Sequence, residues 1–156
     1  MSTQPSSATD LGAGLIAALA ERDFPRLADT LTPDVRMRAL IPPGLVEIAG
    51  AEAAAAKFSS WFGDAEEFEL ICSGSDPVAD RQHVFYRLRV RKPGNTTKLV
   101  EQHLLCALTG SQVSVLDLVC TGFRPNDVAG KSTALGQDDA HTAQASDAKA
   151  GRRTAS

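Results

Sequence analysis

The chain has 156 residues, of which 43% are hydrophobic and 22% are charged, and its net charge is −3 at neutral pH. This length suits one domain with a single core. The charge gives no electrostatic footprint for nucleic acid, the apolar runs are too short for a membrane span, and the N-terminus has no secretory pattern. We therefore expect neither nucleic acid nor a membrane as a partner. The three cysteines are widely separated, which argues against a disulfide framework and for a cytoplasmic location.

The ends of the chain differ in composition from its middle. Residues 1–9 are rich in Ser, Thr, Gln and Pro and are expected to be flexible. Residues 126–156 contain few large apolar side chains and cannot offset the entropy of ordering, so they are predicted to form a disordered tail. The folded domain is expected at about residues 10–125.

The first part of the domain is predicted to be helical. Apolar residues recur with the helical period over 11–19, with Thr9 or Asp10 available as the N-cap. A second, short helix should begin near Asp23. The alanine-rich segment 51–62 is the clearest helix, because alanine has the highest helix propensity and the aromatic residues lie along one side of it.

Extended segments are predicted both before and after the helix at 51–62. Two short strands are predicted at 35–40 and 45–48, on either side of the turn residues IPPG. From residue 66 the apolar period changes to two, and glycines mark the turns between longer strands. Adjacent strands with short connections form an antiparallel meander, and helices followed by strands indicate the α+β class. These four longer strands are expected at 66–75, 81–91, 98–109 and 113–123.

This order of elements resembles the nuclear-transport-factor-2-like superfamily, in its SnoaL-like branch, over about residues 10–125. The resemblance rests on FPRLADTLTPDVRMRAL, on the step from LVEIAG into the third helix, and on a last hairpin containing SVLDLVCTGF. It implies a cone, in which a strongly curved antiparallel sheet wraps around about three N-terminal helices and leaves an apolar pocket at the wide end. Known members include polyketide cyclases and ketosteroid isomerase, and also binding domains without activity.

Asp117 interrupts an otherwise apolar strand at 114–123. A carboxylate in such a strand is costly to bury unless it is hydrogen-bonded, paired or protonated. Arg87 could approach Asp117 across the intervening strand and hold it ionised. Two-residue turns at the glycines would place one set of side chains on the face of Asp117: Phe85, Arg87, Gln102 and Leu104.

A single β-bulge would change this face, because it would bring Glu101 and His103 to the side of Asp117 instead. The sequence leaves both registers open. In SnoaL-like cyclases an Asp on the last strand, near polar residues of the preceding strand, is associated with proton abstraction. The resemblance therefore implies such a role for Asp117, with His103 as a match for the polar partner and Gln102 or Glu101 as alternatives.

The leading hypothesis is a pocket enzyme without cofactor that performs acid–base chemistry on a small, apolar, oxygenated molecule, by isomerisation, cyclisation or hydration. Asp117 would be the acid or base, and Arg87 or His103 would stabilise developing negative charge. Neither metal-ligand spacing nor a nucleotide-binding glycine pattern is found, so no metal or organic cofactor is expected. The alternative is a non-catalytic ligand-binding or dimeric interaction module. The expected ligand-binding residues are Trp61, Phe62, Phe85, Gln102 and Leu104.

The last two strands also predict an assembly. The segments LLCAL (104–108) and LDLVC (116–120) are apolar at both alternating positions, whereas a sheet with one wet face alternates more cleanly. One face should pack on the helices and the other on something else. We therefore expect a homodimer formed through the sheet, and the resemblance implies the same.

Overall fold

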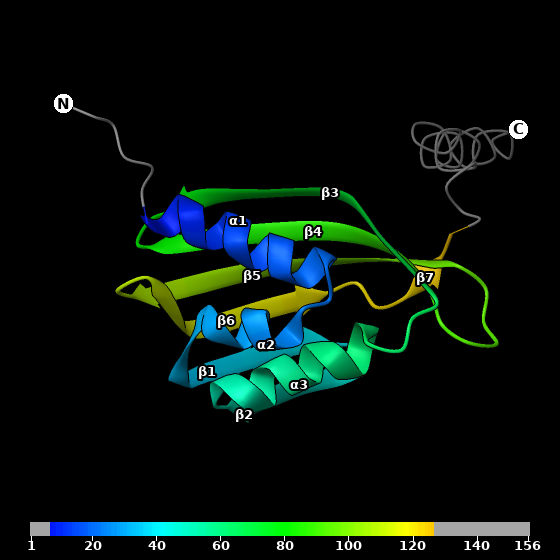
Figure 1. Cartoon of the computed structure of the whole chain (residues 1–156), viewed down its shortest axis with the longest axis horizontal. Coiled ribbons are helices and arrows are strands. Elements are labelled where there is room, and N and C mark those ends of the chain that lie inside the picture. The colour runs from blue at the N-terminus through cyan, green and yellow to red at the C-terminus, as the bar shows by residue number, and fades with distance from the viewer. Residues whose placement is uncertain (1–6, 127–156) are drawn as a thin grey trace, which may run out of the picture. The chain divides into compact units, whose positions relative to one another are not determined.

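The computed structural model describes residues 7–126, so most of the predicted flexible N-terminus (1–9) and of the predicted disordered tail (126–156) lies outside the described residues (Figure 1). The described residues up to Arg124 form one compact unit. None of the helices in this part of the chain combines the length and apolar character that a membrane crossing requires. The helices are α1 (Ser7–Ala20), α2 (Phe24–Asp29) and α3 (Ala51–Phe62).

A local signal of the sequence accounts for the start of α2. Asp23 caps α2, since its side chain accepts a hydrogen bond from the backbone N–H of Arg26 at 3.2 Å. The helix α1 begins at Ser7, earlier than the predicted caps. The first strand begins at Leu31 rather than at residue 35.

The strands form one mixed sheet, in the order β2-β1-β6-β5-β4-β3. The meander from β3 to β6 is antiparallel, as predicted. The pairing of β1 with β6 is parallel, so the expectation of an entirely antiparallel sheet was wrong. The period of a strand sets its faces but says nothing of its direction relative to a distant partner. The strands are β1 (Leu31–Ile41), β2 (Gly44–Ala49), β3 (Glu67–Val78), β4 (Arg81–Arg91), β5 (Lys98–Thr109), β6 (Gln112–Cys120) and the short β7 (Arg124–Pro125).

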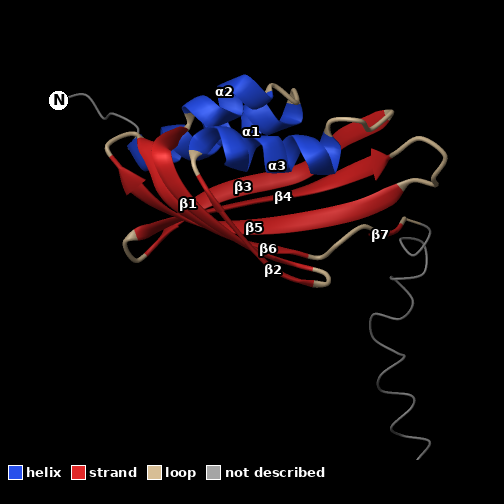
Figure 2. Cartoon of the chain, turned by 90° about the horizontal axis from the view of Figure 1, so that it is seen from below, coloured by secondary structure: helices blue, strands red, loops and turns tan. Residues whose placement is uncertain are grey.

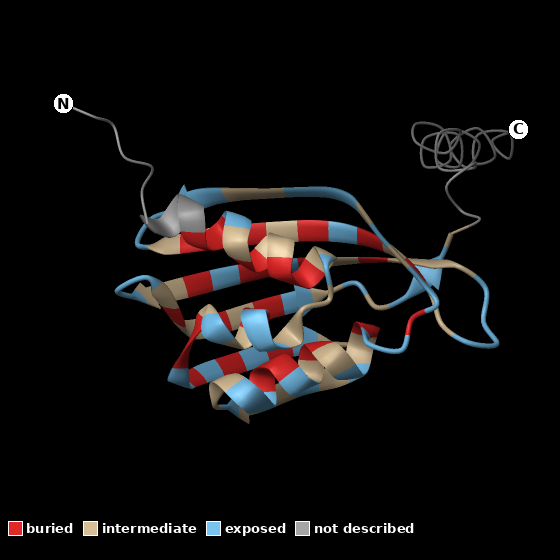
Figure 3. Cartoon of the chain, in the orientation of Figure 1, coloured by how far each residue is buried: buried red, intermediate tan, exposed pale blue. Residues whose placement is uncertain are grey.

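Within residues 7–126, all three helices cover one face of the curved sheet and leave the other face bare (Figure 2). We call the covered face the inner face and the bare face the outer face. The helix α1 packs on β3 and β4, and α3 packs on β1 and β2. Buried residues alternate with more exposed ones along the strands (Figure 3), and β4 buries every second side chain from Gln82 to Val90. The core therefore lies between the helices and the inner face.

The corner after α1 holds the end of α3 in place. Arg22 has a positive φ of 54°, and its Nη1 donates to the carbonyl oxygens of Phe62 at 3.1 Å and Ala65 at 2.9 Å. These acceptors include a carbonyl at the C-terminal end of a helix, where a cation is favourable. The guanidinium also lies 5.1 Å from the ring centroid of Phe68. The aromatic end of α3 is thereby fixed against the sheet.

Candidate functional site

One extra residue in β6 decides the face on which Asp117 lies. The pairing of β5 with β6 shifts at Ser114, which forms a β-bulge, and beyond it Asp117 lies opposite Leu105. The bulge turns Leu116 and Leu118 toward the helices, where both are buried. Burying two leucines is favourable and burying a carboxylate is costly, so the hydrophobic effect selects this register. Of the two registers that the sequence left open, the bulged one forms.

The register between β4 and β5 also differs by one residue from the prediction. Arg87 pairs with Glu101 rather than with Gln102. The strands are joined by residues 92–97 and not by a two-residue turn. The two one-residue shifts cancel for β4, so Phe85 and Arg87 still share the face of Asp117, as predicted.

The predicted set around Asp117 therefore divides between the two faces. Gln102 and Leu104 point to the inner face, where they are 1% and 0% exposed, so their expected place beside Asp117 was wrong. The outer face, which carries Asp117, also carries the following side chains: Phe85, Arg87, Glu101 and His103.

Two guanidinium groups hold Asp117 on the outer face. Its Oδ1 accepts from Nε of Arg38 at 2.8 Å, and its Oδ2 accepts from Nη1 of Arg81 at 3.2 Å. The hydrogen bond from Arg38 is the main cause that lowers the pKa of the Asp117 carboxyl below its ordinary value, although partial burial opposes it. An ionised carboxylate with two cationic partners is a weak base. Arg87, the expected partner, binds Glu101 instead, with Nε 2.9 Å from Oε1.

An open groove of about 540 Å³ lies on the outer face beside Asp117. His83 and His103 also line it. An exposed apolar surface of this kind marks a site of interaction with another molecule. Half of its lining residues are aliphatic and between 39% and 58% exposed: Leu40, Leu45, Val78, Leu105 and Val119.

A second, smaller cavity of about 180 Å³ lies between the end of α3 and the inner face. Three of the expected ligand-binding residues, Trp61, Phe62 and Gln102, line it. Phe85 and Leu104 do not, since Phe85 is on the outer face and Leu104 lies within the core. The full lining is Ile41, Pro42, Trp61, Phe62, Val100, Gln102, Cys120, Gly122 and Phe123.

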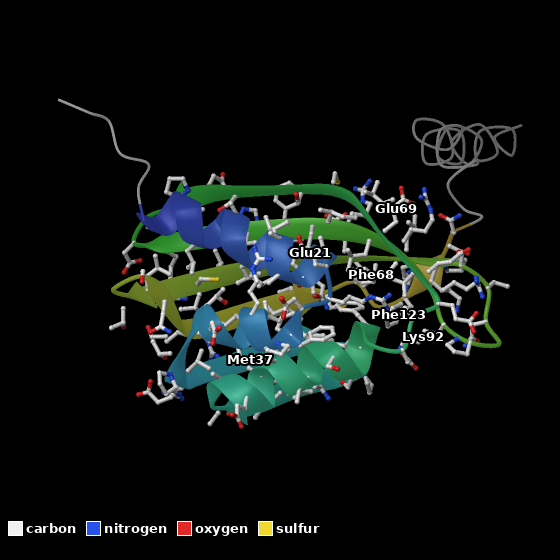
Figure 4. All side chains as sticks on the ribbon, viewed as in Figure 1. Glu21, Met37, Phe68, Glu69, Lys92 and Phe123 are labelled. Carbon is white, nitrogen blue, oxygen red and sulfur yellow. The ribbon has the colours of Figure 1, made fainter. Side chains whose placement is uncertain are left out.

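Phe123 reaches this cavity because the chain turns at Gly122. The φ of Gly122 is +80°, a conformation that favours glycine, and a Cβ at this position would lie 3.0 Å from Cγ of Pro42. The ring of Phe123 packs against Phe62 with centroids 6.2 Å apart. Nζ of Lys92 lies 5.4 Å from the Phe123 centroid, and Figure 4 shows both side chains near the end of α3. Phe123 was not among the site residues expected from the sequence.

The polar groups of the cavity form a short hydrogen-bonded series. The hydroxyl of Tyr86 donates to Oε1 of Gln102, and Nε2 of Gln102 donates to Sγ of Cys120 at 3.3 Å. Burial raises the pKa of the Tyr86 phenol well above its ordinary value, so the hydroxyl stays protonated. Sulfur is a weak acceptor. The amide N–H groups of Gln102 are therefore the best donors that the cavity offers to an oxygen atom of a ligand.

Within residues 7–126, His, Cys, Asp and Glu side chains do not gather in groups of three or more that could hold a metal ion. Burial raises the pKa of the Cys106 thiol to about 12, which makes it a poor ligand and nucleophile near neutral pH.

No protein-family model matches the sequence, and no curated protein matches it either. Solved structures do match. A Xanthomonas campestris protein, provisionally assigned as a polyketide cyclase, has a TM-score of 0.60 and 15% identity over 72% of this chain and 89% of its own. A hypothetical protein from Catenulispora acidiphila with a ketosteroid-isomerase-like fold, solved with trimethylamine, has a TM-score of 0.60 and 14% identity over 74% and 85%. A nuclear-transport-factor-2-like protein of unknown function from Burkholderia pseudomallei has a TM-score of 0.58 and 16% identity over 73% and 90%.

This chain has the nuclear-transport-factor-2-like fold. The expected curved α+β sheet with three helices on one side is confirmed, apart from the parallel pairing of β1 with β6. At these identities the likeness concerns the fold alone, and a fold does not imply a function. The function of this nuclear-transport-factor-2-like domain must be argued from its own side chains.

The ion pairs of Asp117 should make part of the stability of the domain depend on pH. Because the folded-state pKa of Asp117 is lowered, its contribution is present above the unfolded pKa of about 3.9 and is lost as the pH falls through the folded value. We expect the melting temperature of Asp117→Asn to fall less than that of the wild type on acidification below about pH 4. Asp34→Asn, which removes an exposed carboxylate of β1, is the matched control. An equal fall of the melting temperature with pH for the wild type and Asp117→Asn would contradict the prediction.

Proposed function

We propose that this chain is a SnoaL-like ligand-binding protein whose inner cavity takes one small, apolar, oxygen-bearing molecule. The supporting observation is the separation of the expected site residues. Trp61, Phe62 and Gln102 line the cavity. The three side chains expected to be catalytic belong to the outer face instead: Asp117, His103 and Arg87.

The chemistry of the cavity favours binding over acid–base catalysis. General acid–base catalysis requires a group that exchanges a proton near neutral pH within hydrogen-bond reach of the substrate. Among the described residues, those that line the cavity offer an amide, a thiol, aromatic rings and aliphatic groups, but no carboxylate and no imidazole. Tyr86 lies behind Gln102, and burial keeps its phenol protonated. Retention of a ligand is therefore better supported than its conversion.

The size of the cavity limits the ligand to about one ring. An apolar cavity of about 150 Å³ holds benzene, so about 180 Å³ accommodates a ring or a branched molecule of similar size. An oxygen atom on that molecule would accept a hydrogen bond from Gln102. Trimethylamine, which accompanies the Catenulispora acidiphila protein, is also within this range of size, and it serves as a probe of size alone because it carries no oxygen atom.

Trp61 provides the measurement, because it is the one tryptophan of the chain and it lines the cavity. Titration with cyclohexanone, phenol or trimethylamine should change its fluorescence and raise the melting temperature. Ile41→Phe should fill the cavity and weaken binding by about tenfold or more. Leu108→Phe adds the same ring to a partly buried position outside the lining and should leave binding unchanged.

Two results would refute the proposed cavity ligand. One is Ile41→Phe protein that binds the same probe as tightly as the wild type does. The other is wild-type protein that shows no fluorescence change and no thermal shift with any of the three probes at millimolar concentration.

We also propose that the outer face joins two copies of this chain in a homodimer. The exposed aliphatic side chains of the groove form one surface, which water would otherwise cover at a cost. Leu105 and Val119 belong to the segments whose apolar residues at both alternating positions led to this expectation. In a twofold interface the same patch lies on both sides, so that apolar surface meets apolar surface.

Two carboxylates of the outer face suit such a partner because each is already paired with a cationic side chain. Asp117 binds Arg38 and Arg81, and Glu101 binds Arg87. Covering a paired charge is less costly than covering a single one, which would lose its hydration without compensation. Sedimentation equilibrium of the full chain tests the proposal, and a monomer throughout the micromolar range would refute it.

A further inference from the structure

A series of hydrogen-bonded side chains, which we call the histidine chain, crosses the strands β3, β4 and β5 on the outer face. Nδ1 of His83 lies 2.9 Å from Oδ1 of Asp76, and Nε2 of His83 lies 3.0 Å from Nδ1 of His103. Nε2 of His103 lies 2.7 Å from Oε2 of Glu101. The other oxygen of Glu101 accepts from Arg87. These five side chains are the members of the histidine chain.

The two imidazole rings are well placed for a direct hydrogen bond. Their planes are within 7° of parallel, and their centroids are 5.3 Å apart, so the N–N contact joins the edges of the rings and not their faces. Phe85 lies beside both, with centroids 5.6 Å from His83 and 5.5 Å from His103. The side chain of His83 is 24% exposed and that of His103 is 45% exposed. The pair is therefore partly shielded from water even in a single protomer.

The number of protons in the histidine chain follows from its three contacts. Ionised carboxylates only accept hydrogen bonds, so the ring nitrogens that face Asp76 and Glu101 must both carry hydrogen. The contact between His83 and His103 needs one more hydrogen. Two neutral imidazoles together carry one hydrogen too few, whereas two imidazolium ions would place N–H against N–H. All three contacts are satisfied only when the pair holds a single extra proton.

In this singly protonated state the charges of the five side chains of the histidine chain sum to zero. The carboxylates of Asp76 and Glu101 are balanced by Arg87 and by the one positive charge of the imidazole pair. Loss of the proton leaves one net negative charge and one contact without hydrogen. Gain of a second proton leaves one net positive charge and breaks the central contact.

Neighbouring charged groups do not change their state over the pH range in which histidine titrates. Hydrogen bonding by His103 lowers the pKa of Glu101, and hydrogen bonding by Arg38 lowers the pKa of Asp117, so both carboxylates stay ionised. Arg38, from β1, and Arg81, from β4, both bind the Asp117 carboxylate. Cys72, on β3, lies opposite Arg87 and is the one neighbouring thiol that the experiment must control for.

We propose that the homodimer is tightest when the His83–His103 pair holds one extra proton, so that assembly is coupled to pH. This inference rests on the proposed dimer through the outer face. A neutral, fully hydrogen-bonded series loses least when a second copy covers it, whereas the deprotonated series would be buried with one net negative charge on its members and one contact without hydrogen. Dimer formation therefore takes up protons, and the dimer weakens as the pH rises and the pair loses its extra proton.

Sedimentation equilibrium of the full chain at about pH 6 and about pH 8 tests this coupling. The Kd of the wild-type dimer should rise by about tenfold or more between these values, since each proton released contributes up to about tenfold per pH unit. His103→Gln should reduce the change to less than about twofold. The Cys72→Ser variant should keep the wild-type dependence of the Kd on pH. The His141→Gln variant should keep it too; His141 is the third histidine of the sequence and lies outside the described residues.

The outcomes separate the two proposals. A dimer whose Kd is the same at both pH values would overturn the proton coupling and leave the dimer standing. A monomer at both pH values would overturn both. Nitrogen NMR of the imidazoles counts their protons without reference to assembly: three of the four ring nitrogens should carry hydrogen at about pH 6, and a count of two or four would overturn the protonation argument.

Discussion

Val119→Glu should convert the proposed dimer into a monomer and leave the fold intact. Val119 is 55% exposed and lies on the outer face opposite His103, within the wall of the groove. Twofold symmetry would introduce the carboxylate twice into an apolar interface. Burial of an unpaired charge costs several kcal/mol, so the Kd should rise by about a thousandfold or more. Sedimentation equilibrium measures the change.

The matched control is Ile71→Glu, which places the same charge on an aliphatic residue of the edge strand β3 that is 36% exposed and does not line the groove. It should leave the Kd and the melting temperature near the wild-type values. Val119→Glu protein that dimerises as tightly as the wild type would exclude the outer face as the interface. Equal weakening by Ile71→Glu would show that the effect is a general one of added charge.

Gln102→Leu should cost the domain about 1–3 kcal/mol in the free energy of unfolding. Gln102 is 1% exposed, and it accepts the hydrogen bond of the buried Tyr86 hydroxyl. Leucine has a similar size, so the main loss is the acceptor, and the hydroxyl is left buried without a partner. The same variant should also weaken binding of an oxygen-bearing cavity ligand, because the amide donor is lost. Urea unfolding and Trp61 fluorescence measure the two effects.

A double-mutant cycle separates the hydrogen bond from simple changes in packing. Tyr86→Phe alone leaves the Gln102 oxygen without its donor and should also destabilise the domain. When both partners become apolar, neither polar group is left unpaired, so the double variant should be more stable than the sum of the single effects predicts. Strictly additive effects would show that the bond between Tyr86 and Gln102 contributes little to stability.

The fold was accessible from the sequence because its signals are local. Asp23 marks the start of α2, the alanines of 51–62 form α3, and the change of period after residue 66 predicts the strands of the meander. Trp61 and Phe62 were expected at a pocket because they stand at the end of a helix that packs on the sheet, and both line the inner cavity. Each of these inferences depends on residues that are close together in the chain.

The partners of Asp117 could not be found in the same way. Arg38 reaches Asp117 through the parallel pairing of β1 with β6, and Arg81 reaches it from the start of β4. The alternation in VRMRAL does place Arg38 on the polar side of its strand, but it does not say which strand lies next to it. Phe123 was missed for a related reason, since its position depends on the turn at Gly122 and on the packing of α3.

The sequence by itself determined the elements, their order and the α+β class, because helix caps, helix propensity and the alternation of apolar residues act over a few neighbouring positions. The tertiary structure alone decided which face receives Asp117. A single bulged residue, Ser114, reverses every later side chain of β6, and the energy that selects the bulge comes from burying Leu116 and Leu118 under helices that are distant in the chain. That choice of register leaves the inner cavity without charged side chains and places both the ion pairs and the aliphatic groove on the outer face.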